Sequence, residues 1–187
     1  KQVRFEIVTA RSENGLGFKP ETGSEAGNAT CPFCGSVADS AYVKTEGCAG
    51  RIGHQLMAVA TVSGVRRGKI FIEAEQAKGA LPKAELIEKR VEKLCTSAGI
   101  SIPNELMVDD SKNSFWVTLY GPQTYGDLFT RRQLLALLTF CAMIREAGKQ
   151  IRQDTGDAER AKAIVSMLAL VLDKIADCNS ALSGWEP

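Results

Sequence analysis

Two cysteines separated by two residues are the clearest chemical feature of the sequence. They lie in the run Cys31-Pro32-Phe33-Cys34-Gly35. Thiols at this spacing can grip a metal ion from one side. Proline stiffens the turn between them, and glycine lets the backbone fold back so that both sulfurs face one centre. The run therefore predicts one half of a zinc site.

A complete zinc site needs two further ligands, and the nearest candidates along the chain are Cys48 and His54. The resulting spacing, Cys-x2-Cys-x13-Cys-x5-His, is close to the spacing used by zinc ribbons and fingers. We therefore predict a structural zinc ion bound by Cys31, Cys34, Cys48 and His54. The alternative is that Cys48 and His54 are incidental and that the first pair is the relic of a ribbon.

Catalytic chemistry has few candidates in this sequence. Its single histidine means that a Ser-His-Asp triad could be built only on His54, and no nucleophile elbow accompanies it. Cys48 and His54 could form a nucleophilic pair, but beside the first two cysteines they are better metal ligands. The sequence has no phosphate-binding Walker loop and no His-Glu-x-x-His motif. We expect no catalytic residue in it.

The composition is that of an ordinary globular protein, with 187 residues of which 44% are hydrophobic and 24% charged. The net charge of +1 means that any surface for nucleic acid must be local. No apolar run is long enough to cross a bilayer, so we expect no membrane partner. Six cysteines without a regular framework indicate the reducing cytoplasm. We expect the chain to be a piece of a longer protein.

Residues 1–80 read as a small zinc-ribbon-like antiparallel β unit. Strand patterns occur at 3–9, 41–44, 55–63 and 69–73. The last two patterns predict a hairpin with a basic tip. Such short strands bury too little apolar surface to be stable alone, which is why a metal is expected among them.

Residues 81–187 read as a mainly helical unit with one strand near 114–120. A helical pattern over 82–98 is stopped by Gly99, and Thr130 with Gln133 forms a capping box before a helix that extends to about 153. A second long helix follows the break at 154–157. Two long helices joined by so short a turn pack as an antiparallel hairpin. The predicted fold class is therefore α+β.

Several basic side chains are candidates for contact with nucleic acid. They lie after the cysteine pair, at the hairpin tip and at the start of the first long helix. The alternative is that they are charged because turns and helix surfaces are solvated. The candidate residues are Arg51, Arg66, Arg67, Lys69, Arg131 and Arg132.

Several stretches together resemble adenine-specific DNA methylases that carry a zinc ribbon. Residues 27–35, 49–53 and 55–59 resemble the ribbon of that family. The block 126–137, which contains Asp-Leu-Phe-Thr, and the closing 179–185 resemble its later blocks. In the family pattern the positions of Cys48 and His54 are not fixed as ligands.

The resemblance implies a segment of an enzyme that uses S-adenosylmethionine to methylate the exocyclic N6 amine of adenine. In that family the cofactor loop lies upstream and an Asp-Pro-Pro-Tyr motif lies downstream, and this sequence contains neither. S-adenosylmethionine would therefore bind only in the parent protein. The expectation is a non-catalytic insertion that helps the remaining methylase domains to engage DNA or its target sequence. The alternative is a protein-interaction or scaffold module with a structural zinc ribbon.

Overall fold

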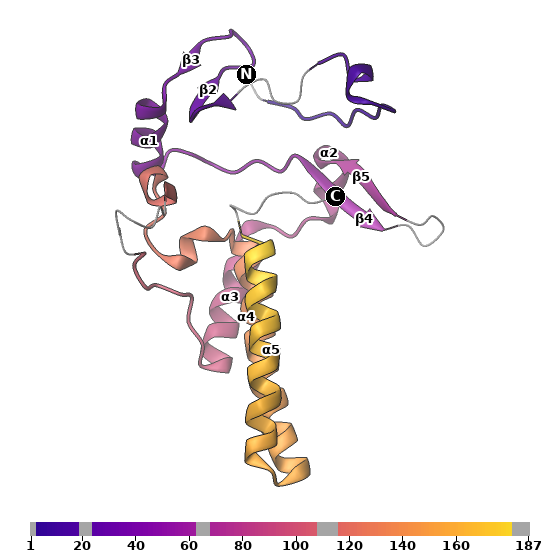
Figure 1. The fold of residues 1–187 in the computed structure, drawn as a ribbon, viewed down its shortest axis with the longest axis vertical. Coiled ribbons are helices and arrows are strands. Elements are labelled where there is room, and N and C mark those ends of the chain that lie inside the picture. Colours follow the sequence, from indigo (N-terminus) through magenta and orange to yellow (C-terminus); the bar gives the residue numbers. More distant parts are fainter. Residues whose placement is uncertain (1–2, 19–23, 63–67, 108–115, 181–187) are drawn as a thin grey trace. The chain divides into compact units, whose positions relative to one another are not determined.

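The computed structural model describes residues 3–18, 24–62, 68–107 and 116–180 (Figure 1). The chain divides into two compact units, Lys1–Leu81 with Trp116–Gly121 and Pro82–Phe115 with Pro122–Pro187. The N-terminal unit contains two small antiparallel sheets, and the C-terminal unit contains the long helices. The predicted α+β class is confirmed at this level.

The first sheet of the N-terminal unit has three short antiparallel strands in the order β1-β2-β3. These are β1 (Ser24–Glu25), β2 (Asn28–Thr30) and β3 (Val37–Ala38). Ala26 and Gly27 form the turn between the first two strands, with φ of 50° and 83°. Two successive positive φ angles are typical of a tight hairpin turn whose twist matches that of the strands. The second hairpin, β2-β3, is closed by the run that holds the two cysteines.

Helix α1 (Ser40–Cys48) occupies the place where a strand was predicted over 41–44, and that prediction is wrong. The Asp39 carboxylate accepts a hydrogen bond from the Tyr42 backbone N–H at 2.7 Å. Aspartate at this position satisfies a backbone donor that the first helical turn leaves unpaired. This cap outweighs the strand preference of Tyr42 and Val43.

The predicted hairpin between residues 55 and 73 is confirmed as β4 (Ala58–Val62) paired with β5 (Lys69–Glu73). The predicted tip at 64–68 lies largely outside the described residues. A strand was also predicted over 3–9, but the structure has none there. Instead, the Gln55 side-chain amide donates a hydrogen bond to the Val3 carbonyl at 2.8 Å.

A 3-10 helix, η3 (Trp116–Tyr120), replaces most of the strand predicted near 114–120 and packs against α1. The close approach requires glycine at Gly47, because a Cβ there would overlap the Tyr120 backbone carbonyl. Gly121 is constrained in the same way by the Gly47 backbone. The Lys44 ammonium lies 5.9 Å from the centre of the Tyr120 ring, where a cation is favourable. A segment distant in sequence is thereby attached to α1.

Substitution Gly47→Ala should loosen the contact between α1 and η3. We expect the added methyl group to lower the free energy of local opening of α1 by about 1–3 kcal/mol, despite the better helix propensity of alanine. Hydrogen exchange of the α1 amides measures this free energy. Gly53→Ala is the matched control, because no atom lies within 4 Å of a Cβ built at Gly53. Equal protection of the α1 amides from hydrogen exchange in Gly47→Ala and Gly53→Ala would contradict the prediction.

In the described part of the C-terminal unit, the three long helices are α3 (Ala84–Ala98), α4 (Arg131–Thr155) and α5 (Ala158–Cys178). All three were predicted, and Gly99 ends α3 in the left-handed conformation with a φ of 59°. Helix α3 packs against α4 around one apolar core. The most buried residues of that core are Ile87, Val91, Leu134 and Leu138.

The start of α4 is fixed by the predicted capping box. The Thr130 N–H donates to the Gln133 side chain at 2.7 Å, and the Gln133 N–H donates to the Thr130 hydroxyl at 3.4 Å. Further along α4, the Arg145 guanidinium donates to the Gly99 carbonyl at 2.9 Å, where a cation complements the C-terminal end of α3. The remaining short helices are η1 (Glu13–Gly15), α2 (Ala74–Ala77), η2 (Lys78–Ala80) and η4 (Tyr125–Leu128).

Helices α4 and α5 pack side by side as the predicted hairpin (Figure 1). They lie close together at Gly148, where a Cβ would lie 2.7 Å from the Cγ2 of Val165. Valine is stiff at its first side-chain dihedral, so it cannot easily turn away. Glycine at this position therefore sets the spacing between the two helices.

The effect of Gly148→Ala on the free energy of unfolding should have opposite signs with valine and with alanine at position 165. With valine present, we expect overlap to lower the free energy of unfolding by about 1 kcal/mol net. In a Val165→Ala background, the overlap is gone and alanine should raise the free energy of unfolding by about 1 kcal/mol through helix propensity. Urea denaturation of the unaltered chain, of each single variant and of the double variant measures both changes in free energy. The same effect in both backgrounds would show that the helices do not meet at this point.

Candidate metal centre

The two cysteines of the predicted half-site lie on a hydrogen-bonded turn between β2 and β3. The Cys31 N–H donates to the Ser36 carbonyl at 2.8 Å, and the Gly35 N–H donates to the Cys31 carbonyl at 2.9 Å. Gly35 has a φ of 71°, a conformation that glycine adopts without strain. The turn thus reverses the chain as the sequence predicted and places both thiols on one short loop.

The thiol of Cys34 has a polar environment that favours its ionised form. Its Sγ lies 3.3 Å from the hydroxyl oxygen of Ser36. Hydrogen bonding with the Ser36 side chain and backbone, and with the Cys31 side chain, holds the pKa of Cys34 below its ordinary value. The thiolate is the form that binds metal. Sequence reasoning missed Ser36, although a hydroxyl residue two positions after Cys34 was visible.

The pair is open to solvent. Cys34 is exposed and Cys31 is partly exposed. A shallow hollow of about 610 Å³ lies beside Cys31, between β2, β3 and the first turn of α1. The apolar side chains of Val37 and Tyr42 line it and are themselves 62% and 58% exposed. A ligand or another protein can therefore reach the sulfurs directly.

Cys48 and His54, the other two predicted zinc ligands, are placed differently. Cys48 is the last residue of α1, a helix of nine residues whose first residue, Ser40, follows β3 and the Asp39 cap. The Cys48 thiol donates a hydrogen bond to the Leu119 carbonyl at 3.4 Å. His54 is exposed in the extended segment that follows.

The predicted set of four ligands is not gathered into one cluster. Every cysteine and the single histidine lie within the described parts of the chain. In those parts, no group of three or more Cys, His, Asp and Glu side chains could hold a metal ion. The structure therefore brings together Cys31 and Cys34 and places the other two candidates elsewhere.

The remaining cysteines lie on the helices of the C-terminal unit. Cys95 packs against the apolar core, and Cys141 is partly buried. Burial raises the pKa of the Cys141 thiol, which makes it a poor nucleophile and a poor metal ligand. Cys178 is exposed near the end of α5.

The basic residues predicted to contact nucleic acid fall into three groups. Arg51 forms two hydrogen bonds of 2.7 Å with the Glu46 carboxylate, and this pairing raises the pKa of Arg51. Arg131 forms an ion pair of 3.3 Å with Glu88. The side chains of Lys69 and Arg132 are exposed. Arg66 and Arg67 lie outside the described residues.

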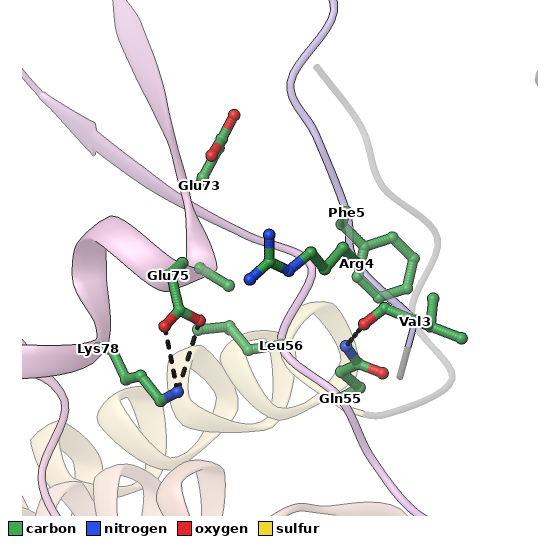
Figure 2. A pocket seen from close by; sticks show the side chains of 9 residues that line it. Val3, Arg4, Phe5, Gln55, Leu56, Glu73, Glu75 and Lys78 are labelled. Atoms are coloured by element: carbon green, nitrogen blue, oxygen red, sulfur yellow. Dashed lines mark hydrogen bonds and ion pairs between the residues drawn. The ribbon is translucent and has the colours of Figure 1, made fainter. Parts of the chain in front are cut away.

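A second hollow, of about 240 Å³, lies between the N-terminal segment, residues 55–56, and the end of β5 with the short helices that follow it (Figure 2). Figure 2 shows the Arg4 side chain reaching toward Glu73 and Glu75. The Lys78 ammonium pairs with the Glu75 carboxylate at 3.2 Å. The lining contains no cysteine or histidine, so this hollow adds nothing to the thiol pair.

No family model, curated protein or solved structure matches this chain. Among the helices that the structure describes, none is both long and apolar enough to cross a membrane.

Zinc binding should depend on both cysteines of the turn. We expect Cys31→Ser or Cys34→Ser to weaken zinc affinity at least tenfold, because each removes one of the two thiolates held together. Competition with a chromophoric chelator measures the affinity. Cys178→Ser is the matched control, since that thiol is also exposed but lies on α5. Unchanged affinity in the two turn variants would show that the pair is not the metal site.

Proposed function

We propose that this chain is a non-catalytic, zinc-binding segment of an S-adenosylmethionine-dependent adenine-N6 DNA methyltransferase. In this proposal it helps the parent protein to engage DNA or recognise its target. The observation that supports it most is the hydrogen-bonded turn carrying Cys31 and Cys34. It lies in the part of the sequence, residues 27–35, that resembles the zinc ribbon of the methylase family.

The small apolar core of the N-terminal unit supports a structural role for the metal. Of the described hydrophobic residues in that unit, Ala77 alone is buried, with 4% of its surface exposed. The C-terminal unit, in contrast, buries Ile87, Val91, Leu134 and Leu138 together. A small unit with little buried apolar surface commonly needs a metal to hold its fold. Zinc at the thiol turn would supply that stabilisation.

The proposal assigns no catalytic step to this segment. S-adenosylmethionine and the groups that act on adenine would belong to the remaining methylase domains. The segment's own contribution would be binding to the phosphates of the DNA backbone. Phosphate binding displaces counterions, so the affinity falls as the salt concentration rises.

The DNA proposal is tested with the double variant Arg66→Ala/Arg67→Ala. We expect weaker binding to duplexes of any sequence, and a salt dependence that is shallower by about one unit for each phosphate that the variant no longer binds. Fluorescence anisotropy at several salt concentrations measures both. Lys149→Ala is the control, because Lys149 is ion-paired with Glu146 and is not among the candidate DNA-binding residues. If the double variant binds like the unaltered chain, these arginines do not bind DNA.

A protein-interaction or scaffold module is the second candidate, and the helix hairpin favours it. Met167, Leu170 and Val171 follow helical spacing along one face of α5, with 70%, 71% and 57% of their surfaces exposed. On α4, Phe140 and Met143 are 45% and 61% exposed. Exposed apolar side chains at this density suit contact with another protein domain. A chain with this function would not bind duplex DNA at any salt concentration in the anisotropy assay.

A further inference from the structure

We infer that the thiol turn binds zinc between two copies of this chain, with Cys31 and Cys34 of each copy supplying four thiolates. The inference rests on the zinc half-site of the proposed function and not on its methylase assignment. A second copy of the chain would add the two ligands that the half-site lacks.

The number of available ligands leads to this arrangement. A structural zinc ion is bound by four ligands, and the turn offers two. All other cysteines and the histidine lie in described parts of the chain, and none joins the pair in a cluster of three. Cys48, the nearest cysteine along the chain, donates a hydrogen bond to the Leu119 carbonyl instead. In this inference, the two further ligands are therefore thiolates supplied by another molecule.

A second copy is the partner that offers the required chemistry. Two identical turns related by a two-fold axis give a self-complementary contact with four sulfurs around its centre. Each turn leaves its sulfurs accessible at the end of a β-hairpin and not within a closed cavity. The two turns can therefore meet without local unfolding of either chain.

The surface around the turn suits such a contact. Phe33, between the two cysteines, is 45% exposed, and Val37 and Tyr42 beside them are more exposed still. In a two-fold contact these side chains would cover one another and exclude water from the metal. Binding converts four thiols and one Zn²⁺ into four Zn–S bonds and releases four protons, so no oxidant or reductant is needed.

Sedimentation velocity of the full chain under reducing conditions tests the inference. With a chelator present we expect a monomer, and with zinc added we expect a dimer that forms at one zinc per two chains. Cys34→Ser should abolish the dimer, whereas Cys178→Ser should leave it unchanged. Val37→Lys, at an exposed position, should weaken the zinc-dependent dimer at least tenfold without unfolding the chain.

Two outcomes would overturn the inference in different ways. A monomer that binds one zinc per chain, and releases it on Cys48→Ser or His54→Ala substitution, would show that the ligands are completed within one chain. That result would leave the zinc part of the proposed function intact. No zinc binding at any stoichiometry would overturn both. The salt-dependent duplex assay tests the DNA part separately.

Discussion

The hydrogen-bonded turn from Cys31 to Ser36 is the constraint on which the proposed role of the N-terminal unit depends. Two backbone hydrogen bonds and a glycine with positive φ bring the thiols onto one short loop. A site held in this way loses less conformational freedom on binding than a flexible pair would. The turn also connects β2 and β3, so the proposed zinc ion would stabilise the sheet.

Each unit is stabilised by its own kind of interaction. The C-terminal unit relies on helix packing, with α3 against α4 around Val91 and Leu138 and with close contact between α4 and α5 at Gly148. The N-terminal unit relies on short ladders, the Asp39 cap and the approach of η3 to Gly47. Its described residues bury little apolar surface. Under the proposed function, a bound zinc ion would therefore stabilise the N-terminal unit and not the helical one.

The sequence predicted those features whose signals are local. Thr130 with Gln133, and Gly99, identified helix ends that the structure confirms, and the Cys-x2-Cys spacing was enough to predict the turn. The strand predicted over 41–44 is wrong because the cap of α1 sets a helix there. Most of the strand predicted near 114–120 is replaced by η3, which contacts Gly47, about seventy residues away. Cys48, at the end of α1, donates a hydrogen bond to the Leu119 carbonyl, a contact that local sequence patterns do not predict.

The most direct test of the central claim, that the turn is a zinc half-site completed by a second copy, is X-ray absorption of the zinc-loaded chain. The account predicts four sulfur neighbours at about 2.3 Å and no nitrogen neighbour. A shell of three sulfurs and one imidazole nitrogen would contradict it, because that set matches Cys31, Cys34, Cys48 and His54 of a single chain.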